Sequence, residues 1–196
     1  YSGQTELHFA ANAGQGEFIR FIAAPGDLEE MYYWARAALS ISWRYQIPSI
    51  VLYDKNLGEH GYNLDIDRVP PPPELPPLTW DGKGPYRRYA ITDSGISPLA
   101  FPPARDVVVK VNGYAHDEDG ITTEEPEMVT RMQEKLLRKG EGLARDLAGM
   151  PTVTEGGAKG AGDVLLTWGS TAGACREVAD SLGLRVVQPV VLNPFP

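Results

Sequence analysis

Cysteine is almost missing from this sequence. Cys175 is the only one among 196 residues, so the chain forms no internal disulfide and cannot alone supply the thiolates of a zinc or iron–sulfur cluster. Its place inside a predicted helix favours a buried, inert thiol. We therefore expect a reducing, cytoplasmic environment.

Long hydrophobic runs are missing as well. No apolar stretch approaches the roughly 18 to 20 residues that cross a membrane, and residues 1–13 lack the basic start and apolar centre of a signal peptide. The chain starts at Tyr1 rather than Met. We expect no membrane association, and we interpret the sequence as part of a longer subunit.

Positive charge is scarce. Lys and Arg total 18 against 26 Asp and Glu, a net charge of −8. Nucleic-acid binding is disfavoured, because phosphate neutralisation needs clustered basic residues. Histidine is scarcer still: His8, His60 and His116 are dispersed, and their spacing gives no metal triad. The histidines therefore do not predict a metal site.

The first stretch with clear periodicity predicts a strand, a helix and a second strand. Residues 18–23 and 49–53 are short apolar runs typical of strands. Between them Asp27 is a helix cap, and Glu30 three residues later completes a capping box. Apolar residues then recur at helical spacing to about Tyr45. This βαβ order predicts a parallel sheet and an α/β fold.

The middle of the chain is rich in proline. Residues 70–73 and 76–77 are all proline, which favours a stiff connection or a ligand for a proline-recognising domain, so residues 58–105 are expected to be irregular. A strand is predicted at 106–111. A long helix follows from about residue 122, and we expect its charged side to be solvated. Its apolar face comprises Met128, Val129, Met132, Leu136, Leu143 and Leu147.

A second unit of the same kind follows a glycine cluster. Residues 163–168 predict a strand, 169–173 a turn, the residues up to about Leu182 a helix, and 185–192 another strand. The shift in composition at 150–162 marks a domain boundary.

Two segments are candidate sites from their residues alone. Gly169, Ser170 and Thr171 follow a strand and open a helix, where free backbone amides can bind a phosphate or carboxylate. The segment lacks the lysine of a P-loop, and the alternative is a tight turn that requires small residues.

The other candidate is His116-Asp117-Glu118. Its oxygen atoms are suitable ligands for a hard cation. The alternative is a hydrogen-bonded loop in which Asp117 or Glu118 caps free backbone donors.

Several short motifs resemble, in the same order, those of the alpha subunit of 2-oxoacid:ferredoxin oxidoreductases. They cover nearly the whole chain, and their collinearity makes the resemblance specific although each motif alone is weak. The motifs are SGQTEL (2–7), GQGEF (14–18), APGD (24–27), YQIPSIVLYD (45–54), RYAITDSGISP (88–98), GYAHDEDG (113–120), WGSTAGA (168–174) and PFP (194–196).

The resemblance implies a thiamine-dependent enzyme. Such enzymes decarboxylate a 2-oxoacid, for example pyruvate or 2-oxoglutarate, on thiamine pyrophosphate. Electrons pass through a [4Fe-4S] cluster to ferredoxin, and coenzyme A takes the acyl group. In the family the diphosphate, Mg²⁺ and the cluster belong largely to a partner beta subunit, so none is expected to bind this chain alone. The resemblance thus implies a heteromer in which the alpha subunit is inactive without that partner.

The resemblance also divides the chain. Residues 1–68 would be the C-terminal part of a parallel-sheet, pyrimidine-binding-type domain, 69–122 a proline-rich connection with a strand, and 123–150 a long helix. Residues 160–196 would start a second, Rossmann-like domain. The family's Tyr-Pro-Ile-Thr-Pro loop and the glutamate that activates the cofactor are absent and are expected upstream, in the remainder of the alpha subunit.

One position departs from the family pattern. The family has a basic residue, which grips the substrate carboxylate, where this chain has Tyr1. A phenol donates one hydrogen bond but brings no charge. Tyr1, Ser2, Gly3 and Gln4 are therefore substrate-pocket candidates by resemblance, and no catalytic residue is assigned to this chain.

Two other functional classes stay open. One is a non-catalytic interaction subunit of the same fold, which the loss of charge at Tyr1 favours. The other is a stand-alone anion- or nucleotide-binding α/β module built on the turn at Gly169. The sequence does not decide which 2-oxoacid is used.

Overall fold

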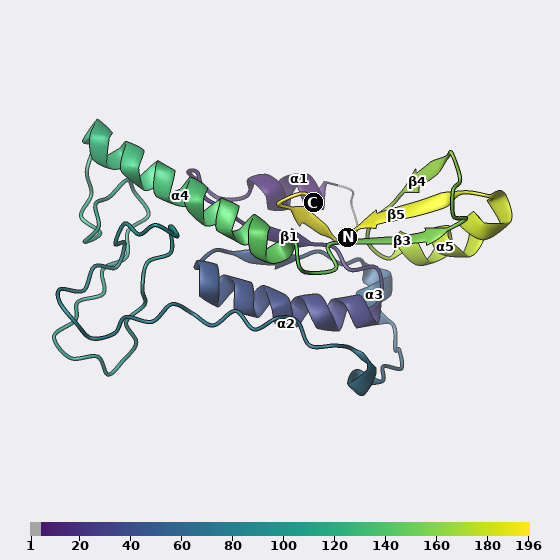
Figure 1. The fold of residues 1–196 in the computed structure, drawn as a ribbon, viewed down its shortest axis with the longest axis horizontal. Coiled ribbons are helices and arrows are strands. Elements are labelled where there is room, and N and C mark those ends of the chain that lie inside the picture. Colours follow the sequence, from purple (N-terminus) through teal and green to yellow (C-terminus); the bar gives the residue numbers. More distant parts are fainter. Residues whose placement is uncertain (1–4) are drawn as a thin grey trace.

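The computed structural model describes residues 5–196 as an elongated α/β protein with two small sheets (Figure 1). The helices are α1 (Glu6–Asn12), α2 (Leu28–Tyr45), α3 (Lys55–Glu59), the 3-10 turn η1 (Ile66–Arg68), α4 (Pro126–Leu147) and α5 (Thr171–Leu182). The strands are β1 (Phe21–Ala23), β2 (Ser49–Val51), β3 (Val153–Gly157), β4 (Val164–Leu166), β5 (Arg185–Pro189) and β6 (Val191–Asn193).

The first sheet has the order β2-β1-β6. Strands β1 and β2 are parallel, with Phe21 opposite Ser49 and Ala23 opposite Val51, and α2 connects them. The predicted βαβ unit is therefore confirmed, with strands shorter than the predicted runs. β6 joins the other edge of β1 antiparallel. The sheet is thus mixed, whereas the sequence predicts a parallel one.

The second sheet has the order β3-β5-β4 and is mixed as well. β4, α5 and β5 form the predicted parallel βαβ unit. The antiparallel strand β3, whose Val153 lies opposite Pro189, is not predicted. Its Val-Thr-Glu-Gly-Gly sequence carries little strand-forming signal, because Glu and Gly are depleted in strands and the pairing with β5 is made by the backbone.

The predicted strand 185–192 divides between the two sheets. β5 pairs in the second sheet and β6 in the first. Val190 between them is fully buried, and its N–H donates to the Thr152 carbonyl at 2.8 Å. From the sequence, a continuous apolar run predicts one strand. The point at which the run divides between two sheets depends on the strands that pair with each of its ends.

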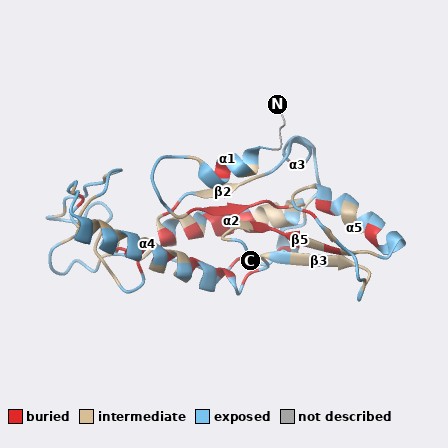
Figure 2. Ribbon diagram, turned by 90° about the horizontal axis from the view of Figure 1, so that it is seen from above, coloured by how far each residue is buried: buried red, intermediate tan, exposed pale blue. Residues whose placement is uncertain are grey.

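Helix α2 forms the main core with the first sheet. Asp27 caps it as predicted, because its side chain accepts a hydrogen bond from the Glu30 amide at 2.8 Å. Trp34 is buried and stacks on Phe21 with ring centroids 5.6 Å apart. Figure 2 shows the buried residues concentrated on α2 and the sheet next to it, with largely exposed segments at both ends.

The predicted strand at 106–111 is wrong. No residue of this run belongs to a strand, and Val108 is 84% exposed. A β-branched run becomes a strand only when a neighbouring backbone takes up its hydrogen bonds, and no strand of the described chain pairs with this run. The segment is held at its end by Tyr89, whose hydroxyl accepts from the Asn112 amide at 2.9 Å.

Helix α4 starts at Pro126, a few residues later than predicted. Its charged side is not fully solvated, which corrects the sequence-based expectation. Lys135 and Lys139 are 5% and 8% exposed, because the loop at 88–97 covers them. Leu137, by contrast, is exposed.

Candidate functional site

Loops from both sheets meet where the parallel strands end. Gly26 follows β1, Asp54 follows β2 and Gly169 follows β4. The Ser170 hydroxyl donates to the Asp54 carboxylate, and a Cβ on Gly26 would lie 2.9 Å from the Gly169 carbonyl oxygen. Carboxyl ends of parallel strands are where α/β proteins bind ligands, so this junction is a candidate site.

The hydroxyl groups of the turn that opens α5 already hydrogen-bond to other groups of the protein. Gly169 has φ +68°, a left-handed conformation that favours glycine. Ser170 stands at the N-cap but makes no side-chain cap. Instead, the Ser170 side chain donates to the Asp54 carboxylate, and this hydrogen bond is the largest cause of the lowered pKa of Asp54. The Thr171 hydroxyl donates to the Trp168 carbonyl at 3.0 Å.

A polar network lies beneath this junction and was not anticipated from the sequence. Gln188 of β5 is fully buried. Its amide nitrogen donates to the Glu30 carboxylate at 2.8 Å, and its oxygen accepts from Arg176 and, at 3.1 Å, from Thr154. Burial raises the pKa of Glu30, against the lowering effect of the Gly26 amide. The one sequence signal for this network was Gln188 itself, a glutamine inside an apolar predicted strand.

His116, Asp117 and Glu118 belong to a separate loop that is held by hydrogen bonds. The Asp117 carboxylate accepts from the Asp119 and Ile121 amides at 3.0 and 2.9 Å. Glu118 accepts from the Ile91 amide at 2.9 Å and from Arg87 at 3.1 Å. The His116 ring contacts Tyr89, with centroids 3.9 Å apart.

The two candidate segments are not brought together. The loop of Glu118 lies against Ile91 and Tyr89. Lys135, in the N-terminal half of α4, donates to the Tyr89 carbonyl, so the loop lies near that half of the helix. Ser170, by contrast, lies at the start of α5. Figure 1 shows these regions at opposite ends of the molecule. Within residues 5–196, no group of three or more His, Cys, Asp or Glu side chains is arranged to hold a metal ion. Cys175 lies on α5 and is half-buried rather than buried.

Two buried lysines were also missed. The Lys135 ammonium donates to the Tyr89 carbonyl at 2.8 Å and to the Ser97 hydroxyl at 2.6 Å. Burial lowers the pKa of Lys135 to about 7 and that of Lys139 to about 8. Their positions continue the helical spacing of Met132 and Leu143, and this spacing was the available signal.

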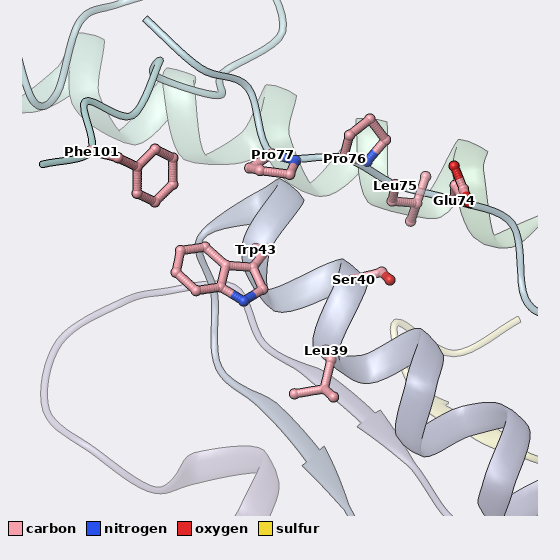
Figure 3. Close-up of a pocket in the computed structure, with 8 residues that line it drawn as sticks. All are labelled: Leu39, Ser40, Trp43, Glu74, Leu75, Pro76, Pro77 and Phe101. Carbon is pink, nitrogen blue, oxygen red and sulfur yellow. The ribbon is translucent and has the colours of Figure 1, made fainter. Parts of the chain in front are cut away.

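The structure has a groove between α2 and the proline-rich connection. Figure 3 shows Trp43 and Leu39 of α2 beside Pro77, and the Trp43 ring contacts Phe101 with ring centroids 5.7 Å apart. The groove that these residues line has a volume of about 470 Å³. The proline-rich segment lies along α2, where Arg44 donates to the Pro76 carbonyl at 3.4 Å. A second cavity of about 430 Å³ lies beside Arg20 and Gly140.

Comparison with known proteins places the chain in a family. Residues 2–135 match the family model described as "Pyruvate flavodoxin/ferredoxin oxidoreductase, thiamine diP-bdg". The chain belongs to this family. The match contains Asp54, the loop at 88–97 and the loop of Glu118, and it ends before Ser170. The pocket candidates Tyr1, Ser2, Gly3 and Gln4 lie outside the described residues.

Curated relatives extend the family likeness over the whole chain. The 2-oxoacid:ferredoxin oxidoreductase subunit alpha of Saccharolobus solfataricus is 29% identical over 212 residues, covering 100% of this chain and 32% of the relative. Subunit alpha of the second such enzyme of Aeropyrum pernix is 30% identical over 203 residues, covering 100% and 31%. The chain is homologous to these alpha subunits and spans about a third of their length.

A solved family structure has the same fold. The 2-oxoglutarate:ferredoxin oxidoreductase from Magnetococcus marinus, with 2-oxoglutarate, coenzyme A and succinyl-CoA bound, matches with a TM-score of 0.83 and 28% identity. The match covers 98% of this chain and 34% of that chain. Both sheets of the present chain, including the part after residue 135, therefore have a counterpart in the Magnetococcus marinus structure. No described helix is long and apolar enough to span a membrane.

Proposed function

We propose that the chain is part of the alpha subunit of a thiamine-dependent 2-oxoacid:ferredoxin oxidoreductase. The complex would decarboxylate a 2-oxoacid oxidatively to an acyl-CoA and pass the electrons to ferredoxin. The observation that carries the proposal is the likeness of the fold over 98% of the chain to an enzyme of this class, with a TM-score of 0.83. Collinear relatives of the same class support it.

The described residues do not fit the metal or the cluster of such an enzyme. They contain no group of side chains that could hold a metal ion, and the sequence has one cysteine. In the proposal thiamine pyrophosphate, Mg²⁺ and the [4Fe-4S] cluster are held mainly by a beta subunit, as the family resemblance implies.

This chain would supply a wall of the substrate pocket. Residues 1–68 would complete the pyrimidine-type domain, with Tyr1, Ser2 and Gln4 as polar pocket residues. Residues 160–196 would begin the second domain, whose turn at Gly169 contacts the first domain through Gly26.

Purification of the full-length subunit with its partners tests the proposal. We expect a cysteine-rich chain to co-purify and the complex to reduce ferredoxin with a 2-oxoacid and coenzyme A. The subunit alone should show no such activity. A co-purified complex that is inactive with pyruvate, 2-oxobutyrate and 2-oxoglutarate would favour the non-catalytic interaction subunit, and a monomer that binds nucleotides tightly would favour the stand-alone module.

Tyr1→Arg tests the pocket assignment in the same complex. If Tyr1 faces the substrate carboxylate, a guanidinium gains about 1.5 to 3 kcal/mol over a neutral donor, roughly ten- to a hundredfold in binding. The KM for small 2-oxoacids should fall, or the preference among them should shift. Identical KM values and preferences for all three acids would show that Tyr1 is not a pocket residue.

A further inference from the structure

Four cationic side chains gather where the loop at 88–97 crosses α4. Arg88 lies over the Tyr89 ring at 5.0 Å from the ring centroid, and Lys135 lies at 5.8 Å from the same centroid. Arg138 donates to the Thr92 carbonyl at 3.5 Å. The fourth, Lys139, follows Lys135 by one helical turn and repels both it and Arg88. We call these four residues the cation cluster.

The acceptors within the cluster are neutral. Arg88 donates to the Gln46 amide oxygen at 2.7 Å, and Lys135 donates to a carbonyl and a hydroxyl. None of the four makes an ion pair within residues 5–196. Glu118 is the carboxylate whose charge acts on Lys135, and it is already paired with Arg87.

Two cationic side chains of the cluster have N–H donors with no acceptor among the described residues. The Nε atom of Arg138 is buried without a partner in the described chain. Lys139 is 8% exposed and donates no hydrogen bond to any described residue. Buried cations without a counter-charge are costly and are rare in proteins unless a partner neutralises them. The protein as a whole is acidic, with a net charge of −8, so general electrostatics does not account for the cluster.

We propose that the cation cluster binds a phosphate-type oxyanion. A doubly charged oxyanion has enough oxygen atoms to accept from guanidinium and ammonium donors together. Arg88 and Arg138 are half-buried, whereas the lysines are buried. The anion would therefore enter between the guanidinium groups. This site is independent of the oxidoreductase proposal, because it requires neither a 2-oxoacid nor a second subunit.

Titration of inorganic phosphate into the full-length protein at constant ionic strength tests the site. Calorimetry at pH 7 should show binding, and phosphate should raise the thermal unfolding midpoint. Lys139→Met should weaken phosphate binding at least tenfold while the protein stays folded, because methionine fills the buried position without a charge. Lys110→Met, which removes an exposed lysine, should leave binding unchanged.

A parallel titration with adenosine monophosphate distinguishes a free phosphate from a phosphate group on a larger molecule. Equal binding supports a free oxyanion at the cluster, and tighter binding supports a larger phosphorylated ligand there. Arg88→Gln gives a second variant that should also weaken binding if Lys139→Met fails to fold. Absence of binding to the wild type, or undiminished binding in both cluster variants, would overturn the proposal.

Discussion

At the scale of single residues, Gly95 makes the cover over α4 possible. It has φ +75°, and a Cβ there would overlap the Lys135 carbonyl and lie 2.7 Å from the Lys139 amide nitrogen. The backbone of the 88–97 loop therefore approaches the helix as closely as a glycine allows. This approach is what buries Lys135 beneath Ser97 and Tyr89.

Gly95→Ala should destabilise the protein by about 2 to 4 kcal/mol, since left-handed strain and backbone overlap add. Gly82→Ala is a matched control, because Gly82 has φ +81° and open space around its Cβ position. Gly82→Ala should lower the free energy of unfolding by the backbone strain alone, about 1 to 2 kcal/mol. Urea unfolding compares the two variants, and equal losses would mean that the loop does not pack on α4 as described.

The buried lysines also make stability depend on pH. The folded state lowers the pKa of Lys135 to about 7 from the ordinary value of 10.5. Between these values the unfolded chain binds more protons than the folded one, so stability rises with pH from about 7 towards 10.5. Below pH 7 both states are charged, and this group adds no slope. Lys139, Arg88, Arg138 and Glu118 act on the same group.

Lys135→Met should reduce this slope. Urea unfolding midpoints at pH 7, 8 and 9, measured for wild type and variant, check the expectation. The wild type should gain stability over this range by more than the variant does. If the two profiles run parallel, Lys135 is charged at all three pH values in the folded state, and its burial is weaker than the structure indicates.

At the scale of elements, the two sheets are joined by polar contacts as well as by the chain. Gln188 on β5 reaches Glu30 in the first turn of α2, while Arg176 on α5 lies 3.7 Å from the same carboxylate. Gln188 is fully buried, so its hydrogen bonds have no water to replace them. The α2 N-terminus and the second sheet are thereby held in one arrangement.

Gln188→Leu should therefore destabilise the protein by about 2 to 3 kcal/mol, because Glu30, Arg176 and Thr154 each lose a hydrogen bond at a position that water does not reach. Gln133→Leu on the exposed side of α4 should change stability by no more than about 0.5 kcal/mol. Guanidinium unfolding followed by tryptophan fluorescence measures both. A loss for Gln188→Leu as small as for Gln133→Leu would show that the network does not join the sheets.

At the scale of the whole molecule, both sheets depend on one continuous stretch of chain. β5 ends at Pro189, β6 begins at Val191, and the fully buried Val190 lies between them. The second sheet cannot separate without pulling β6 from β1. The opposite end, from the loop at 88–97 to the run at 107–111, packs on α4, where Lys135 donates to the Ser97 hydroxyl, and on α2, where the Trp43 ring contacts Phe101.

This connection predicts that the two sheets unfold together. Hydrogen exchange of the β1 and β5 amides should report the same free energy of opening, and far-UV circular dichroism should show one transition. If the β5 amides exchange with a clearly lower free energy than those of β1, the second sheet is an independently unfolding unit.

The sequence by itself determined what depends on neighbours along the chain. The Asp27 cap, the periodicity of α2 and the strand–helix–strand order are local signals, and they predicted both βαβ units. The ordered motifs also identified the family. The hydrogen-bonded turn around Asp117 was one of two interpretations, and its backbone geometry is of this kind.

Only the tertiary structure decided which segments meet. The valines at 107–111 have strand-forming side chains but no neighbouring strand among the described residues, and the run at 185–192 divides because its two ends find different partners. Lys135 and Lys139 carry the charges of a solvated face, yet a distant loop covers them. Burial and strand pairing are long-range properties, because they are set by whichever chain segment closes over a residue rather than by the residue's own preference.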